Sequence, residues 1–495
     1  MAHAGAKQST PIIVIFLAAA LAACGNATAA PGDATSTIAA TNQPAASQPT
    51  LTSAAPTAEL PASAAPPIAT TLTADGPWLV FNTSQGLFAA NTDGSVVTRL
   101  VGSPAIAAPR DLRVAVAPNG GRMALIYSEE GVGLSLHMIT LPDGADTLIT
   151  VLRSPPPDVP AGYRDEVVEA IVNEGSLAWS PDGSMLAFIG GMNGPSADVY
   201  VYRTADGSIT QLTNGDSQAY QLSWSPDGKY ILHAGAGSFG TGAGYSMEGV
   251  WAARADGSEV KTLYTPTSVN EIFVGWVTPT TFLVYSGDAM CGAHDLRTFD
   301  IESGREAARV VSYFNGDGVA MDAVSGTVIF SADEIVAGCN EDKTAGTFRL
   351  NLGELGTTQT TSEVARKIVF APQVGAFFGQ TETGAVEIKQ DGTAAPLDSP
   401  ARSVPLISPD GRFWAWHSDG FITSPGAWIG PFHGDTAEIS GDSVRAAIWS
   451  MDSQYLFFVS ANGMYRVNAG MTLLTPIATP SIDVIDVNTI AWVTQ

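Results

Sequence analysis

The stretch LAWSPDGSMLAF, residues 177–188, decides the fold of this chain. It consists of an apolar strand ending in Trp179, an SPDG turn at 180–183 and a second apolar strand. Serine at the first, proline at the second and glycine at the fourth position are the residues that a type I turn favours. The pattern recurs at 222–233, 406–416 and 447–458, and in a weaker form at 114–125. The chain is therefore a repeat protein.

Nine positions, Trp179 among them, occupy the same place in the repeat, and most neighbours in this series lie 37–52 residues apart. These anchors are Val116, Trp179, Trp224, Trp276, Met321, Phe370, Ile407, Trp449 and Trp492. Well-formed repeats continue with a third strand, a second tight turn and a fourth strand, as in DVYVYRTADGSITQL at 198–212, where the Asp-Gly pair is a hairpin signal. Four short antiparallel strands in a repeat of about 45 residues predict a β-propeller blade.

The two ends of the sequence predict how the ring closes. Residues 78–100 read as three strands without a first one, and the sequence continues for one strand around Trp492. Joining these ends completes a blade and removes the open edges of an unclosed ring. We therefore expect an all-β protein, a β-propeller of four-stranded antiparallel blades closed by joining its N- and C-terminal strands. The anchors count nine blades, but propellers typically have four to eight and the repeat at Phe370 is short. We expect eight blades, within a range of seven to nine.

The first 23 residues predict a lipoprotein signal peptide. One lysine precedes an apolar run at 11–23, and a run of about 13 residues is too short to span a bilayer as a helix. The run ends in LAACG at 21–25, which resembles the lipobox of bacterial lipoproteins, where cleavage precedes the cysteine and its thiol is acylated. We expect lipidation at Cys24, with an ordinary secretory signal as the alternative. The protein would then be exported and lipid-anchored on the extracytoplasmic face of the bacterial membrane.

Composition predicts a linker at 24–75 and a propeller domain at 76–495. The linker is rich in Ala, Thr, Pro and Ser and has no Lys, Arg or aromatic residue. It cannot bury enough apolar surface to offset its ordering entropy, so we expect it to be disordered. The chain carries 48 acidic against 23 basic residues and a formal net charge of −25. This charge repels phosphate backbones and argues against nucleic acid as a partner. We expect a monomer.

The WSPDG strand–turn–strand followed by an Asp-Gly hairpin resembles the repeat of the TolB-like propellers. That family includes the propeller halves of prolyl-oligopeptidase-type peptidases. The resemblance covers about residues 78–495 and implies the fold, but propellers host many unrelated activities. TolB itself is implied to be a periplasmic protein-binding partner of outer-membrane lipoproteins, and this chain departs from it by its own lipobox and stalk. No G-x-S-x-G nucleophile elbow occurs, so we set the peptidase branch aside.

Loop lengths predict which face of the ring binds. The first and third turns of a blade lie on one face, and the second turn and the link between blades lie on the other. Tight turns make up the first face, whereas the second carries long segments at 152–174, 190–197, 234–248, 286–295 and 331–346. Binding residues concentrate on loops held by a rigid scaffold, so we expect binding on the second face; drift of unselected loops is the alternative. The candidate residues are Tyr163, Asp165, Glu166, Tyr245, Asp288, His294, Asp333 and Glu341.

Two cysteines, a glycine-rich stretch, one histidine and the acidic loop residues could each have a functional or a purely structural role. Cys291 and Cys339 lie about one repeat apart in neighbouring blades, so an exported chain permits a disulfide between them; two separate thiols are the alternative. GAGSFG at 235–240 fits a nucleotide-binding glycine pattern but is expected in a loop without a following helix, so we expect no cofactor there. His233 takes a strand position that aromatic residues hold elsewhere and should be a core residue. The acidic loop residues form either a site for a cation or basic partner, or a solvated rim.

No catalytic motif or metal-binding histidine spacing occurs in the sequence. We therefore expect a cell-envelope-anchored propeller that is not an enzyme. It would act as a non-catalytic binding or protein-interaction scaffold for an unknown protein or envelope glycan, without a cofactor. The alternative is a propeller enzyme of the lyase or glycosidase type that uses carboxylates at the central channel.

Overall fold

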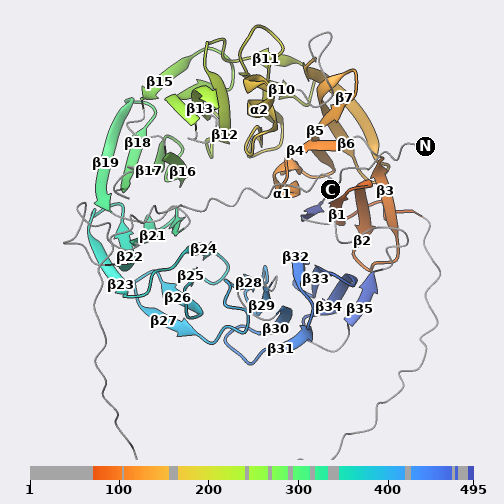
Figure 1. The fold of residues 1–495 in the computed structure, drawn as a ribbon, viewed down its shortest axis with the longest axis vertical. Helices are drawn as coiled ribbons and strands as arrows, with labels where there is room; N and C mark the ends of the chain where they lie inside the picture. Colours follow the sequence, from red (N-terminus) through yellow and green to blue (C-terminus); the bar gives the residue numbers. More distant parts are fainter. Residues whose placement is uncertain are drawn as a thin grey trace, which may run out of the picture. The chain divides into compact units, whose positions relative to one another are not determined.

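The computed structural model describes residues 71–102, 105–154, 165–239, 245–265, 270–287, 294–312, 318–332, 345–418, 425–470, 474–477 and 489–494. In these residues nine four-stranded antiparallel sheets form a ring, which is a β-propeller (Figure 1). The predicted fold class is confirmed, and the blade count lies within the predicted range, one above the eight that we favoured. We number the blades 1 to 9 in the order of their anchors.

The strands of the first four blades have the following bounds. Blade 1 contains β4 (Ala105–Ala108), β5 (Arg122–Glu129), β6 (Gly133–Thr140) and β7 (Ala145–Arg153). Blade 2 contains β8 (Leu177–Trp179), β9 (Met185–Gly190), β10 (Asp198–Arg203) and β11 (Ile209–Gln211). Blade 3 contains β12 (Gln218–Trp224), β13 (Tyr230–Phe239), β14 (Tyr245–Arg254) and β15 (Val260–Tyr264). Blade 4 contains β16 (Asn270–Trp276), β17 (Thr281–Gly287), β18 (His294–Asp300) and β19 (Arg305–Ser312).

The other five blades follow the same order. Blade 5 contains β20 (Val319–Asp322), β21 (Thr327–Ala332), β22 (Gly346–Asn351) and β23 (Thr357–Thr361). Blade 6 contains β24 (Lys367–Ala371), β25 (Ala376–Gln380), β26 (Ala385–Lys389) and β27 (Ala394–Leu397). Blade 7 contains β28 (Leu406–Ile407), β29 (Phe413–Ser418), β30 (Gly426–Pro431) and β31 (Ala437–Ser440). Blade 8 contains β32 (Val444–Trp449), β33 (Tyr455–Ser460), β34 (Gly463–Asn468) and β35 (Leu474–Ile477). Blade 9 joins β36 (Ile490–Val493) to β1 (Trp78–Thr83), β2 (Gly86–Asn91) and β3 (Val97–Val101).

Blade 9 closes the ring as the sequence predicted. Its inner strand, β36, comes from the C-terminal end and pairs antiparallel with β1, so that Trp78 faces Val493 and Phe81 faces Ile490. The two ends of the folded unit therefore lie side by side in one sheet (Figure 1). Strand pairing between the ends leaves no open sheet edge at the closure.

The short repeat at Phe370 explains the difference between eight and nine blades. It forms the complete blade 6, whose strands have only four or five residues each. Phe377 and Phe378 of β25 are fully buried, so the blade has a core in spite of its length. The repeat is short because its strands and turns are short, and no strand is missing.

The SPDG turn is a hydrogen-bonded unit. The Ser180 hydroxyl donates to Asp182 at 2.6 Å and accepts from the Met185 backbone N–H at 2.9 Å. The Gly183 N–H donates to the Ser180 carbonyl at 2.8 Å, and Gly183 has a φ of +67°. Glycine reaches this left-handed region without a steric cost, which explains the last letter of the motif. The same hydroxyl bonds recur in the turns that begin at Ser225, Ser408 and Ser450.

The anchor tryptophans connect neighbouring blades. The Trp179 indole N–H donates to the Ala115 carbonyl of blade 1 at 2.9 Å, and the Trp224 indole N–H donates to the Ala178 carbonyl of blade 2 at 2.8 Å. Trp449 and Trp492 make the corresponding bonds to the blades that precede them, at 2.9 and 2.7 Å. These side chains therefore pack as expected and also bond across the boundary between blades.

Two short helices depart from the all-strand expectation. In blade 1, α1 (Leu112–Ala115) occupies the place of most of the strand expected before Val116. Within the expected loop 152–174, α2 (Glu166–Val172) packs on the core through Val167, Ala170 and Ile171. No helix in the described part of the chain is long and apolar enough to cross a membrane.

Trp179→Phe tests the bond between blades. Phenylalanine keeps most of the buried ring but lacks the N–H, so the carbonyl of the fully buried Ala115 loses its donor. We expect the free energy of unfolding, measured by urea denaturation, to fall by about 1–3 kcal/mol, the cost of an unsatisfied buried acceptor. The matched control is Trp428→Phe in β30, where the indole is partly exposed. Equal losses in the two variants would show that ring packing alone sets the effect.

Candidate functional site

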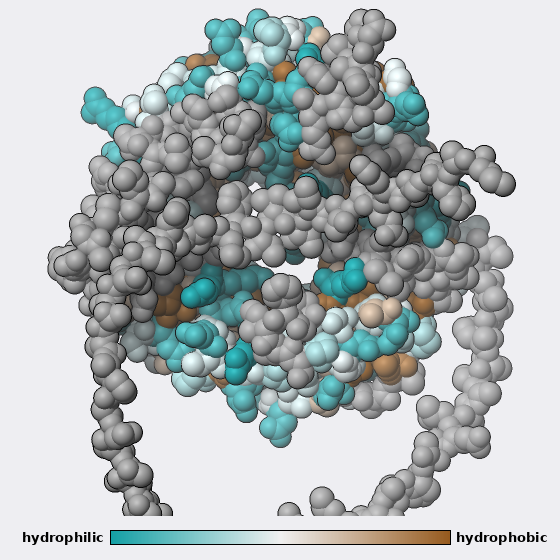
Figure 2. Space-filling view, in the orientation of Figure 1, coloured by the Kyte–Doolittle hydropathy of each residue, from teal (hydrophilic) through white to brown (hydrophobic). Residues whose placement is uncertain are grey.

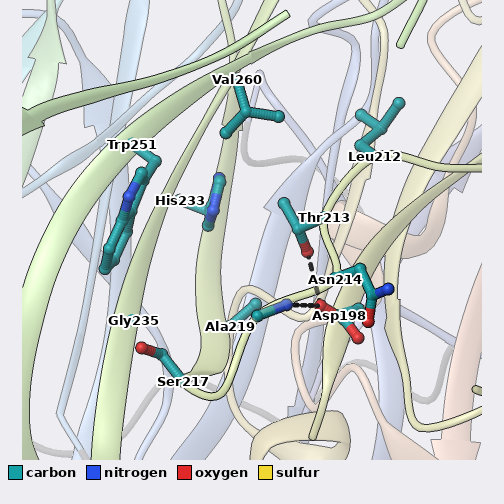
Figure 3. A pocket seen from close by; sticks show the side chains of 11 residues that line it. Asp198, Leu212, Thr213, Asn214, Ser217, Ala219, His233, Gly235, Trp251 and Val260 are labelled. Atoms are coloured by element: carbon teal, nitrogen blue, oxygen red, sulfur yellow. Dashed lines mark hydrogen bonds between the residues drawn. The ribbon is translucent and has the colours of Figure 1, made fainter. Parts of the chain in front are cut away.

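A pocket of about 290 Å³ lies between blades 2 and 3 (Figure 3). It is built by the start of β10, the link 212–217 between the two blades and the paired strands β13 and β14, with Ala219 of β12 and Val260 of β15 beside them. Figure 3 shows Trp251 and His233 on one side of the pocket and Asp198, Thr213 and Asn214 on the other. The pocket thus combines an aromatic wall with a polar wall.

Asp198 holds the polar wall in place. Its side chain accepts a hydrogen bond from the Thr213 hydroxyl at 2.9 Å and another from the Gly215 backbone N–H at 3.3 Å (Figure 3). Only 1% of the residue is exposed, and this burial raises the pKa of the Asp198 carboxyl above its ordinary value. The carboxylate therefore fixes the link between the blades, which forms the polar side of the pocket.

His233 and Trp251 form the aromatic wall. They face each other across β13 and β14, with ring centroids 5.7 Å apart and an angle of 15° between the ring planes. His233 is 5% exposed, as expected for a core residue, and burial lowers its pKa to about 4. The imidazole is therefore neutral near pH 7. Its Nδ1 has no hydrogen-bond partner among the described residues.

Two glycines leave room for the indole of Trp251. A Cβ at Gly235 would lie 2.5 Å from the indole ring, and one at Gly249 would lie 2.7 Å from it. Both distances are shorter than any real contact, so a side chain at either position would displace the ring. This corrects the expectation for GAGSFG, because Gly235 lies in strand β13 and not in a loop. An isolated glycine in a strand often marks such a close approach.

Polar groups surround the mouth of the pocket. Asn214 is exposed, and the Ser217 hydroxyl donates to the Glu248 carboxylate. A serine that donates its proton keeps two lone pairs that can accept, and an asparagine amide can both donate and accept. The mouth therefore offers hydrogen-bonding groups of both kinds.

A second hollow, of about 410 Å³, lies against the inner strands β28 and β32 and beside α1. Its charged lining includes Asp111 and Arg113, which form an ion pair at 2.6 Å. Arg445 lines it as well, and both arginines are exposed. We take the pocket between blades 2 and 3 as the candidate site because its lining includes a buried carboxylate, Asp198, and a buried imidazole, His233.

A serine–histidine–aspartate network lies in blade 1, outside both hollows. His137 is 2.8 Å from Asp146 through Nδ1 and 3.1 Å from the Ser135 hydroxyl through Nε2. These distances match a nucleophile, a base and an orienting acid. Ser135, however, has no exposed surface and also donates to Glu129 at 3.3 Å. A substrate does not reach this hydroxyl, so the network is a polar connection between strands that runs from the buried Ser135 to the exposed Asp146.

Two of the predicted loop residues, Asp165 and Glu166, lie in the described structure at the start of α2. Asp165 caps α2 by accepting from the Val168 N–H at 2.8 Å and pairs with Arg153 at 2.6 Å. Glu166 is exposed in the first turn of the same helix. Neither residue lines the pocket.

The other predicted sites are not described. Tyr245 and His294 begin β14 and β18, but their side chains lie outside the described part of the structure. The remaining ones lie outside the described residues: Cys24, Tyr163, Asp288, Cys291, Asp333, Cys339 and Glu341. In the described part of the chain, no group of three or more His, Cys, Asp or Glu residues is placed to hold a metal ion.

On the face in Figure 2, hydrophilic residues predominate over the upper part, where Figure 1 places blades 2 and 3. The most exposed large apolar side chains are Val324, Leu148 and Met451, which come from three different blades. Scattered apolar residues are normal on a monomer, whereas a protein-binding surface gathers them in one patch.

Comparisons with known proteins give short or distant matches. No protein-family model matches the chain. It is 43% identical over 54 residues to the uncharacterised peptidase YuxL of Bacillus subtilis (strain 168), which is 11% of this chain and 8% of that protein. The chain therefore matches less than a tenth of the length of this curated relative.

Solved structures share the architecture. The crystal structure of the eukaryotic initiation factor covers 84% of this chain and 98% of its own, with a TM-score of 0.54 and 12% identity. TolB from Acinetobacter baumannii covers 57% of this chain and 62% of its own, with a TM-score of 0.30 and 15% identity. At such identities, the likeness to the initiation factor shows the fold alone.

The match to a peptidase contradicts the expectation that this chain is not an enzyme. That expectation rested on the absence of contiguous catalytic motifs. In a propeller, side chains from different blades meet at a site, so a search for contiguous motifs does not detect them. We therefore withdraw the expectation. The match covers too little of either chain to assign an activity to this one.

His233→Phe tests the buried imidazole of the aromatic wall. The folded pKa of about 4 lies below the ordinary 6.5, so the unfolded chain takes up the proton first as the pH falls. The contribution of the neutral His233 to the free energy of unfolding is therefore complete above pH 6.5. This contribution is lost as the pH falls from 6.5 towards 4. This loss amounts to about 3 kcal/mol at most.

Urea denaturation of wild type and His233→Phe at several pH values measures the effect. We expect the difference in the free energy of unfolding, wild type minus variant, to fall steadily below pH 6.5. Asp198 is present in both proteins and cancels from the difference. A difference that stays constant over this range would show that the imidazole is not held neutral by the fold.

Proposed function

We propose that this protein is a cell-envelope propeller that recognises a small ligand in the pocket between blades 2 and 3. The observation that supports this function is the composition of the pocket: a buried carboxylate, a buried imidazole and a partly buried indole around one cavity. Ligand sites are concave, mostly apolar, and carry a few fixed polar groups that orient the ligand. Recognition is also the first step of catalysis, so the same pocket serves a binding protein or an enzyme.

The scattered exposed apolar residues favour a small ligand over a large protein partner. A stable protein interface has a contiguous apolar core, and the exposed large apolar side chains of the described surface are spread over five blades, with at most three in any one. The pocket, in contrast, gathers Leu212, Ala219 and the indole of Trp251 in one place.

A fragment screen on the full-length, detergent-solubilised protein tests this function. Saturation-transfer NMR with a library of neutral and charged fragments detects weak ligands directly. We expect a subset to bind the wild type and to lose most of their signal with Trp251→Ala. The matched control is Trp428→Ala, in the third strand of blade 7, where Gly426 likewise lies against the indole. Thermal melting of both variants confirms that they fold. Fragments that bind all three proteins alike, or none at all, would exclude the pocket.

We further propose that Cys24 anchors the propeller to the membrane through the linker 24–75. The LAACG sequence supports the anchor, and a linker of about 50 residues spans roughly 40 Å as a coil. Recognition would then occur at a distance from the membrane surface.

Cys24→Ser tests the anchor in a bacterial host that lipidates its exported proteins. We expect the variant to move from the membrane pellet to the soluble fraction and to lose the mass of the acyl groups. The control Cys291→Ser should remain in the pellet. A Cys24→Ser protein that stays in the pellet with unchanged mass would contradict lipidation.

A further inference from the structure

The volume of the pocket between blades 2 and 3 limits the size of its ligand. A cavity of about 150 Å³ in a protein core holds benzene, whereas drug-sized ligands occupy about 300–1,000 Å³. The present pocket, at about 290 Å³, has room for one six-membered ring with substituents. A folded protein or a helical peptide does not fit inside it.

The charges in the wall favour an uncharged ligand. Asp198 is the one carboxylate that lines the pocket in the described structure, and no lysine or arginine lines it. An anion would therefore meet a carboxylate without a cation to balance it. A cation would meet carboxylates that are already engaged, Asp198 by Thr213 and Gly215 and Glu248 at the mouth by Ser217, and would lose its own hydration. His233 is neutral near pH 7 and adds no charge.

The aromatic wall favours a ring with a flat apolar face. Gly235 and Gly249 carry no side chain beside the indole of Trp251, which is only partly buried. The face of an indole is electron-rich, and the C–H groups of a saturated ring that carries oxygen are slightly positive. Such a ring packs its C–H face on the indole with an electrostatic gain that a purely aliphatic chain does not have.

The polar wall favours a ligand with hydroxyl groups around its edge. Thr213, Asn214 and Ser217 stand opposite or below the aromatic wall (Figure 3). The Asn214 amide offers a donor and an acceptor and the Ser217 hydroxyl offers an acceptor, and a polyol carries hydroxyls that both donate and accept. Thr213 already donates to Asp198 and accepts from the Val199 N–H, and Ser217 donates to Glu248. The remaining capacity lies in the Asn214 amide and the lone pairs of Ser217, which a plain aromatic ring would not use.

From this combination we infer that the pocket binds one neutral pyranose ring, as a free monosaccharide or as a residue of a glycan. The inference rests on the proposed function and names the class of its ligand. The C–H face of the sugar lies on Trp251, and its hydroxyls contact Asn214 and Ser217. Asp198 is a positioning residue, because it holds the link that carries these groups.

Titration of the full-length protein in detergent with glucose, galactose, mannose and N-acetylglucosamine tests this inference. Saturation-transfer NMR reports binding and identifies the sugar protons that contact the protein. We expect at least one sugar to bind, with its C–H protons closest to the indole. Trp251→Ala and Asn214→Ala should each weaken that binding at least tenfold, and Trp251→Phe should restore part of it. The matched controls are Trp428→Ala and Asp206→Asn, an exposed turn aspartate of blade 2, and neither should change it.

The outcomes separate this inference from the proposed function. If no sugar binds while library fragments bind in a manner that depends on Trp251, the pocket is a ligand site and the sugar class is wrong. If neither sugars nor fragments bind, both the class and the function fail. A sugar that binds equally to wild type and Trp251→Ala lies elsewhere on the protein and also overturns the inference. Oligosaccharides that bind much more tightly than the free sugar, with the same dependence on Trp251, identify a glycan as the source of the ring.

Discussion

The hydrogen bond from an anchor indole to the backbone of the preceding blade is the side-chain interaction that recurs between blades of this ring. Backbone hydrogen bonds hold each blade together from β-strand to β-strand, and only a few of them, such as Leu222 N–H to the Gly175 carbonyl, run between blades. The bond from Trp179 to Ala115 runs between blades, and so do those of Trp224, Trp449 and Trp492. Each is made at the inner edge, where the blades come closest together. The SPDG turn, which follows directly after the anchor in blades 2 and 3, holds the end of that inner strand in place.

This constraint also explains why a pocket can form between blades without weakening the ring. Blades that are joined at their inner edges diverge towards the outside, and the space between them must be filled by side chains or by links. Between blades 2 and 3, the link 212–217 covers this space but contributes small residues, among them Gly215 and Ser217. Ala219 and Gly235 on the facing strands are small as well. The hydrogen bond from Trp224 to Ala178 still joins the two blades at their inner strands, while the pocket lies open further out.

Much of the fold could be predicted from the sequence because its signals are local. The anchors recur from repeat to repeat, and eight of the nine lie in the first, inner strand of a blade. The ninth, Val116, follows α1 and forms only an isolated bridge to Met123. The pocket could not be predicted, because Asp198, His233 and Trp251 come from two repeats and from different strands. One signal was available: Gly235 interrupts a strand pattern two residues after His233, and such a glycine often marks a close approach of another group. The sequence also carried a signal for the helix α2 that our prediction did not use. Asp165 stands before EVVEAI, and aspartate is a common helix N-cap. Its side chain accepts from the Val168 N–H, as such a cap does.

The size of the pocket and the linker together form a physical argument about affinity. A single pyranose ring has about a dozen heavy atoms, and ligands of ordinary efficiency gain about 0.3 kcal/mol per atom. The total is about 4 kcal/mol, which corresponds to a dissociation constant of about 1 mM. So weak a site is occupied only where its ligand is concentrated or repeated, as in a glycan layer. A linker from a membrane anchor would confine the propeller to such a layer and raise the effective concentration of the ligand without any further contact. The linker and the small pocket are therefore consistent with each other: a site that is weak in dilute solution becomes useful when the protein is held next to many copies of its ligand.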